Sequence, residues 1–179
     1  SSDLNELHDV ELTAISTFGD LGFDRPEVQG PFFLNALFVS ANMRRSVDGP
    51  HGDYVPVFLS EIPRLFDRGI LPIDVALVQV SPPDRHGFCS LGVSVDVARS
   101  AVRNARSVIA QVNPNMPRTL GDGQVHVSRF TAMVAVNDPL PEVDYQSQIG
   151  DKERRVAELV SGLIDDRATL QMGIGAIPD

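Results

Sequence analysis

The chain has 179 residues, of which 42% are hydrophobic and 22% are charged, and its 24 acidic and 15 basic residues give a net charge of −9. This composition is typical of a folded globular domain and excludes a largely disordered chain. The negative net charge argues against a nucleic-acid-binding surface, which needs a concentrated positive field.

The first part of the chain predicts two strands with a short helix between them. Strands are expected at residues 32–39 and 54–59, and the helical stretch passes through Arg44 and Val47. Alternation of apolar, β-branched runs with helical patterns is typical of βαβ units and a mainly parallel sheet.

A second helix is expected directly after residue 59. Ser60 can cap its N-terminus, Glu61 in its first turn is favoured by the helix dipole, and Gly69 can end it beyond Leu65 and Phe66. The dipole already explains Glu61, although a catalytic carboxylate at this position stays an alternative.

The middle of the chain predicts two buried strands and the clearest helix. Residues 74–80 form a continuous apolar run that should be buried on both faces, and residues 107–112 form a second one. Ser94 is the expected N-cap of the helix between them. The apolar face of this helix comprises Val95, Ala98, Ala101, Val102 and Ala105.

The last part predicts short strands and one more helix. Residues 124–127 and 131–136 are expected to pair as a hairpin, and Asp151 is expected to cap the helix. A final strand at 168–172 should lead into a glycine loop. The apolar face of the helix comprises Val156, Leu159, Val160 and Leu163. No linker divides the chain, so we expect a single α/β domain over residues 1–179, with an open, mainly parallel sheet flanked by helices.

Cysteine usage and the chain ends predict the compartment. A lone cysteine, Cys89, is typical of a reducing cytoplasm, and no signal peptide or membrane-length apolar run is present. We therefore expect a cytoplasmic protein that does not enter a membrane. The chain begins without methionine and ends in a glycine loop, so we expect a fragment of a longer protein.

No metal site or cysteine nucleophile is expected. The four histidines are scattered without paired ligand spacing. Cys89 lies three residues after His86, but no orienting third group is apparent, and a buried structural cysteine is the more common case.

Two other features are candidates for ligand binding. Gly173 and Gly175 follow a predicted strand, so they form either a structural turn or a loop whose N–H groups approach a ligand. Arg118 follows a buried strand at the sheet edge where ligands bind, so it either clamps a substrate carboxylate or is an ordinary surface arginine.

Four stretches in this order resemble the acetyl-CoA hydrolase/transferase family, especially its 4-hydroxybutyrate CoA-transferase branch. They are residues 53–63, residues 78–87 with 90–96, residues 109–119, and residues 169–179. The resemblance implies an open α/β fold of the CoA-transferase kind, in which two α/β halves face each other across the active site. This chain resembles most of the N-terminal half, so the missing C-terminal half is an expected partner, and a homo-oligomer is expected.

The family mechanism implies acyl-CoA and small carboxylic acids as substrates, and no permanently bound cofactor. A glutamate attacks the acyl-CoA to give an acyl-glutamyl anhydride, which CoA converts to a glutamyl-CoA thioester. That glutamate lies beyond the glycine loop, so we expect no catalytic residue in this chain. The resemblance assigns CoA binding to the loop Gly173, Ile174, Gly175, Ala176 and Ile177.

Three functions stay open at this point. The first is CoA transfer between an acyl-CoA, of the acetyl or 4-hydroxybutyryl type, and a short carboxylic acid. The second is hydrolysis of acetyl-CoA by an enzyme of the same family. The third is a non-catalytic subunit that binds CoA or depends on a partner chain.

Overall fold

The structure is a computed structural model that describes residues 7–17, 19, 22, 25, 30–142, 144 and 149–173. The chain divides into two compact units, Ser1–Leu140 and Pro141–Asp179. The larger unit has the expected α/β character, with mainly parallel strands and flanking helices. A single domain over the whole chain stays a prediction.

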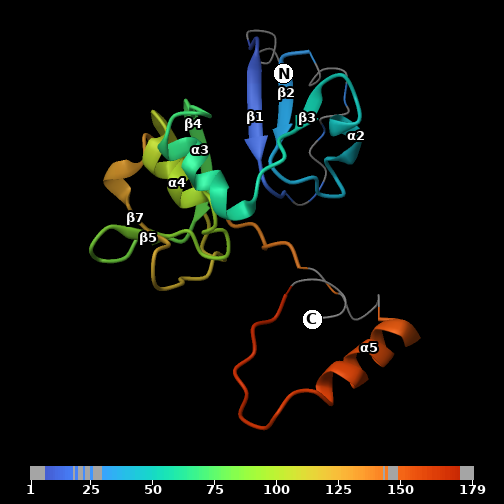
Figure 1. Cartoon of the computed structure of the whole chain (residues 1–179). Helices are drawn as coiled ribbons and strands as arrows, with labels where there is room; N and C mark the ends of the chain where they lie inside the picture. The colour runs from blue at the N-terminus through green and yellow to red at the C-terminus, as the bar shows by residue number, and fades with distance from the viewer. Residues whose placement is uncertain are drawn as a thin grey trace. The chain divides into compact units, whose positions relative to one another are not determined.

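The first sheet of the larger unit is parallel and three-stranded (Figure 1). It contains β1 (Val10–Ala14), β2 (Phe32–Ala36) and β3 (Gly52–Tyr54), in the order β1-β2-β3. The predicted short helix is confirmed as α2 (Arg44–Val47), which lies between β2 and β3 in the chain. Parallel neighbours require such a crossover, because a tight turn can only join antiparallel strands.

The second sheet is also parallel and three-stranded. It contains β4 (Val75–Val80), β6 (Ser107–Val112) and β8 (Ala132–Ala135), in the order β4-β6-β8. The helices α3 (Ile62–Asp67) and α4 (Ala98–Asn104) precede β4 and β6 in the chain. Because the three strands run parallel, their carboxyl ends all lie at one edge of this sheet.

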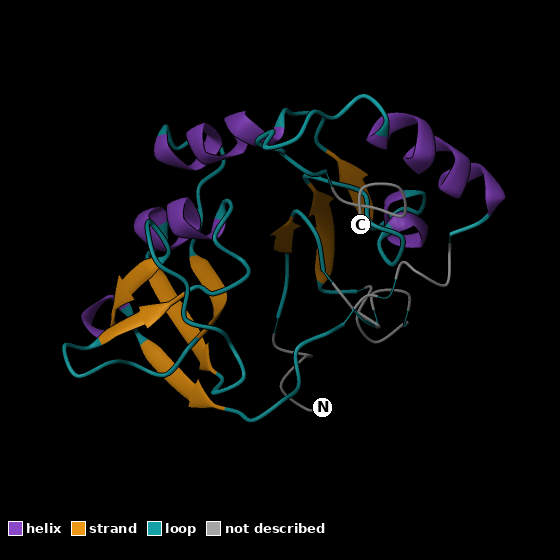
Figure 2. Ribbon diagram, turned by 90° about the horizontal axis from the view of Figure 1, so that it is seen from below, coloured by secondary structure: helices purple, strands orange, loops and turns teal. Residues whose placement is uncertain are grey.

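A short antiparallel pair, whose strands are labelled in Figure 1, lies next to these elements in the chain; all strands are drawn in orange in Figure 2. It joins β5 (Phe88–Ser90) to β7 (Gln124–His126), with Cys89 opposite Val125. β5 follows β4, and β7 precedes β8, so the pair connects segments that are more than 30 residues apart in sequence.

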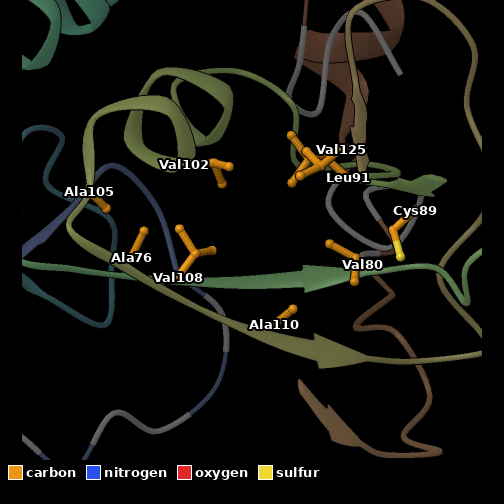
Figure 3. Close-up of a cluster of buried hydrophobic side chains, with 9 residues drawn as sticks. All are labelled: Ala76, Val80, Cys89, Leu91, Val102, Ala105, Val108, Ala110 and Val125. Atoms are coloured by element: carbon orange, nitrogen blue, oxygen red, sulfur yellow. The ribbon is translucent and has the colours of Figure 1, made fainter. Parts of the chain in front are cut away.

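The main core lies between α4 and the second sheet. Figure 3 shows Val102 of α4, and Ala105 directly after this helix, facing strand residues such as Ala76 and Val108. Val102 is 4% exposed and Val108 is 1% exposed, so the hydrophobic effect stabilises this contact. A second cluster, built on Leu37, Ile62 and Phe66, packs α3 against the segment that follows β2.

The smaller unit contains α5 (Asp151–Ser161), which begins after Gly150. The N–H group of Gly150 donates to Oε2 of Glu153 at 3.0 Å, so the N-cap residue is Gly150 and not the predicted Asp151. The apolar side chains of this helix are exposed, with Leu159 at 58% and Val160 at 50%.

Two predictions about strands were wrong. No strand forms at residues 168–172, because a strand needs a hydrogen-bonded neighbour, and the described part of the smaller unit contains none. The predicted hairpin is also absent. β7 pairs with β5 and β8 pairs with β6, because the 3₁₀ turn Val127–Arg129 separates them and redirects the chain.

The predicted strand at residues 54–59 is displaced. β3 ends at Tyr54, and the N–H group of Val55 makes the last backbone contact to Ala36. The next residue is a proline, which has no N–H group to continue the ladder. A 3₁₀ turn, Leu59–Glu61, follows, so Glu61 takes the N-cap position of α3 that Ser60 was predicted to fill.

The ends of helices and the burial of β4 also differ from expectation. Gly69 does end α3, with a φ of 65°. α4 begins later than predicted, because the carboxylate of Asp96, and not Ser94, accepts the N–H groups of Val97 and Ala98. β4 is buried on one face only, since Leu77 on the other face is 73% exposed.

Candidate functional site

Polar side chains gather where β4, β6 and β8 end. Ligands of open α/β sheets bind outside the carboxyl ends of the strands, so this edge is the candidate site. β4 leads into the turn around Asp84, β6 leads into Asn113, and β8 leads into Asn137.

Asn113 ties the three strand ends together. It is fully buried, and its Nδ2 donates to Oε1 of Gln79 at 3.2 Å and to the carbonyl of Asp138 at 2.8 Å. Its Oδ1 accepts from the backbone N–H of Asn115 at 3.0 Å. The Nδ2 of Asn115 in turn reaches Oδ1 of Asn137 at 3.0 Å. The edge is therefore held by side-chain amides, and the amide of the buried Asn113 has both its nitrogen and its oxygen paired.

Asp84 organises the turn that follows β4. Its Oδ1 accepts from the backbone N–H groups of His86 and Phe88, both at 2.9 Å. The Phe88 hydrogen bond is the main reason that the pKa of Asp84 lies below its usual value, with further lowering by the His86 N–H and the charge of Arg118. The carboxylate is thus held in its charged form.

Arg118 lies at this edge, as predicted, and its guanidinium meets three protein oxygens. Nη2 donates to Oδ2 of Asp84 at 2.7 Å and to Oε1 of Gln124 at 3.0 Å. Nη1 donates to the carbonyl of Phe88 at 3.0 Å. The Arg118 and Asp84 side chains are 36% and 32% exposed, so the ion pair is partly shielded from water.

Ser90 anchors the end of the Arg118 loop. This serine is fully buried, and its hydroxyl oxygen accepts from the N–H groups of Thr119 and Gly92, at 3.1 and 3.0 Å. The carbonyl of Thr119 accepts from Nε2 of Gln124 at 2.6 Å. The loop 113–119 is therefore fixed at both ends.

Cys89 is buried as predicted and is poorly suited to nucleophilic attack. It is fully buried, and this burial raises the pKa of its thiol, which lowers the thiolate population at neutral pH. His86 is engaged elsewhere, because its Nε2 accepts from Nε of Arg85 at 3.0 Å. Among the residues that the structure describes, no hydrogen bond joins Cys89 to a histidine.

The predicted CoA-binding loop is described only at its first residue. Gly173 is exposed, whereas Ile174, Gly175, Ala176 and Ile177 lie outside the described residues. CoA binding by this loop accordingly stays a prediction.

In the part of the chain that the structure describes, no group of three or more histidine, cysteine or acidic side chains could hold a metal ion. None of the helices in the described ranges combines the length and the apolar character needed to cross a bilayer.

Sequence reasoning singled out Arg118 but missed Asp84, Ser90 and Gln124. Asp84 follows two prolines and precedes Gly87, a pattern that does predict a turn with an aspartate cap. Nothing local indicates its pairing with Arg118, 34 positions away.

Residues 6–158 match the model of the acetyl-CoA hydrolase/transferase N-terminal domain. Two curated relatives are each 45% identical to this chain. They are the succinyl-CoA:acetate/propanoyl-CoA:succinate CoA transferase of Fasciola hepatica, over 97% of this chain and 36% of its own length, and the 4-hydroxybutyrate coenzyme A transferase of Clostridium kluyveri, over 95% and 39%.

Solved structures of proteins with similar sequences share the fold of this chain. The 4-hydroxybutyrate CoA-transferase of Porphyromonas gingivalis is 34% identical with a TM-score of 0.76, covering 99% of this chain and 40% of the other. RipA of Yersinia pestis is 31% identical with a TM-score of 0.88, covering 99% and 43%. The chain thus spans 36% to 43% of the length of these four proteins.

Proposed function

The chain belongs to the acetyl-CoA hydrolase/transferase family, and from this premise we propose that it forms part of a CoA-transferase. The enzyme moves CoA between an acyl-CoA, of the acetyl or 4-hydroxybutyryl type, and a short carboxylic acid. The observation that carries the proposal is 45% identity, over nearly the whole chain, to two proteins named as CoA transferases.

The proposed reaction passes through a glutamate outside this chain. Its carboxylate attacks the thioester carbonyl, expels CoA thiolate and forms an acyl-glutamyl anhydride. The thiolate then attacks the glutamyl carbonyl, which releases the first carboxylate and leaves a glutamyl-CoA thioester. An incoming carboxylate reverses these steps and leaves as the new acyl-CoA, so the thioester energy is conserved.

This chain contributes binding groups in the proposal. The loop Gly173, Ile174, Gly175, Ala176 and Ile177 contacts CoA, because glycines allow close approach and expose backbone N–H groups. Arg118 is the candidate for the carboxylate of the acid substrate, and its position at the carboxyl edge of the second sheet supports this assignment. CoA is a substrate here, with no resident cofactor, and the location is the cytoplasm.

Hydrolysis is the second candidate, since the matching family description names both activities. The two reactions differ in whether water or a carboxylate attacks the glutamyl intermediates, which depends on how well the closed site excludes water. A non-catalytic CoA-binding or partner-dependent subunit is the third.

The test uses the complete polypeptide that contains this chain. It is incubated with 4-hydroxybutyryl-CoA, with and without acetate, while acetyl-CoA and free CoA are followed by chromatography. A transferase forms acetyl-CoA only with acetate and releases little free CoA, whereas a hydrolase releases CoA regardless of acetate.

Mass spectrometry of the same samples tests the intermediate, which appears as a CoA adduct on a glutamate outside residues 1–179. Residues 1–179 alone serve as the control and should be inactive until a separately expressed C-terminal half is added. If the complete polypeptide neither transfers CoA nor cleaves the thioester, the enzymatic proposal fails.

A further inference from the structure

The guanidinium of Arg118 lies at the centre of a closed hydrogen-bond network. It contacts the turn after β4 through Asp84, the start of β5 through Phe88, and β7 through Gln124. Nε2 of Gln124 in turn donates to the carbonyl oxygen of Thr119, in the loop 113–119, at 2.6 Å. Two edge loops and the β5–β7 pair are thus joined through one side chain.

Nη2 of Arg118 is already occupied by hydrogen bonds to the protein. Nη2 carries two N–H groups, and they are directed at Oδ2 of Asp84 and Oε1 of Gln124. Carboxylates bind arginine most strongly through two parallel hydrogen bonds from adjacent N–H groups. A substrate carboxylate that used Nη2 would therefore have to displace Asp84 or Gln124.

Both carboxylate oxygens of Asp84 are also held by hydrogen bonds. One carboxylate oxygen holds two backbone N–H groups of its own turn, and the other holds Arg118. Swinging this side chain away would leave the N–H groups of His86 and Phe88 without that acceptor, a cost that a loosely held surface carboxylate would not incur.

We infer that Arg118 is a positioning residue: its ion pair with Asp84 acts as a latch that fixes the turn 84–88 and the loop 113–119 at the edge where the substrates bind. This inference rests on the proposed CoA-transferase function, but it replaces one part of that proposal, the direct binding of the substrate carboxylate by Arg118. It gives Arg118 an indirect role in place of direct contact with the substrate carboxylate, and it makes Asp84 a partner in that role.

The two roles make opposite predictions for the variant Asp84→Asn. If Arg118 clamps the acid substrate, Asp84→Asn frees the guanidinium, and the KM for the acid falls or stays constant. If the pair is a latch, Asp84→Asn acts like Arg118→Met, because both break the same bond.

The experiment measures kcat and KM for acyl-CoA and for the acid in the complete enzyme. We expect Asp84→Asn and Arg118→Met each to raise both KM values about tenfold, since misplacement of a binding loop weakens both substrates. The double variant should be no worse than either single variant, because coupled residues are not additive. Arg118→Lys should recover part of the loss.

Arg106→Met is the matched control. Arg106 pairs with Asp74, but these side chains are 85% and 78% exposed and lie at the amino ends of β4 and β6. Its KM values should equal those of the wild type. A rise in the KM for the acid alone in Arg118→Met, with no rise in Asp84→Asn, overturns the latch. Unchanged KM values in both variants also overturn it.

Hydrogen exchange separates failure of the latch from failure of the proposed function. Amides of residues 84–90 and 113–119 should exchange faster in both variants than in the wild type and in Arg106→Met. If they do while the wild-type enzyme transfers no CoA, the latch stands as a loop-fixing device and the proposed function is wrong. If exchange is unchanged, the latch is wrong.

Discussion

Gly92 and Met116 are packed so closely that no side chain fits at position 92. A Cβ on Gly92 would collide with the Met116 side chain and would lie 2.9 Å from the carbonyl oxygen of Pro117. Gly92 also has a φ of 60°, which L side chains rarely adopt. This contact seats the loop 113–119 against the segment that follows β5.

Gly92→Ala should therefore be strongly destabilising. Backbone strain and overpacking act together, and we expect a loss of about 3 kcal/mol in the free energy of unfolding, measured by urea titration. Gly69→Ala is the matched control, because Gly69 has a φ of 65° but no atom within 4 Å of the added Cβ. It should cost about 1 kcal/mol. Equal losses in the two variants would contradict the packing argument.

Asp67 should make stability depend on pH. Ser100 Oγ and Asn104 Nδ2 both donate to its Oδ1 at 2.6 Å, and these bonds, that of Ser100 first, hold its pKa below the usual value. A lowered folded pKa stabilises the fold above the unfolded pKa of about 3.9, and this contribution is lost as pH falls through the folded value.

The measurement compares urea unfolding of the wild type and Asp67→Asn between pH 3 and pH 7. The wild type should be more stable at pH 7, and the difference should shrink toward the acid end. Ser100→Ala should remove much of the same difference. A gap between wild type and Asp67→Asn that is constant with pH would rule out the charged form of Asp67 as its source.

Arg129 caps the C-terminus of α4 from outside the helix. Its Nε donates to the carbonyl of Val102 at 3.1 Å, and Nη2 donates to the carbonyls of Arg103 and Ala105, at 2.8 and 3.1 Å. A cation at a helix C-terminus also interacts favourably with the helix dipole.

Arg129→Met should cost about 1 kcal/mol of unfolding free energy, because the last carbonyls of the helix lose both the donors and the charge. Arg129→Lys should lose less. Arg106→Met, at an exposed ion pair, should change stability by no more than about 0.5 kcal/mol. A loss in Arg106→Met as large as that in Arg129→Met would show that general surface charge, and not capping, is responsible.

The chain of residues 1–179 should self-associate in spite of its net charge of −9. Leu77 and Val134 are 73% and 53% exposed on the face of the second sheet that α4 does not cover, and exposed apolar patches favour association. Sedimentation should show species heavier than 19.4 kDa that increase with concentration.

Leu77→Glu should shift this population toward the monomer. Leu120→Glu is the control, since Leu120 is 90% exposed but lies in a loop away from the sheet strands. A wild-type chain that stays monomeric at high concentration would contradict the prediction, and equal effects of the two variants would locate the contact elsewhere.

Local sequence patterns determined much about this protein. Apolar runs of strand length placed Ser107–Val112, the residues around Arg44 gave a short helix, and the motif order indicated the family, all of which are confirmed. These features depend on backbone preference and on the residue pattern within a short window, which a single sequence displays directly.

Tertiary structure alone decided which segments meet. β7 pairs with β5 and not with β8, and Arg118 pairs with Asp84 across 34 positions. Hydrogen-bond partners of this kind depend on long-range packing, which local periodicity does not encode. The sequence therefore placed Arg118 at the sheet edge, while only the fold showed that its guanidinium faces a carboxylate of the protein itself.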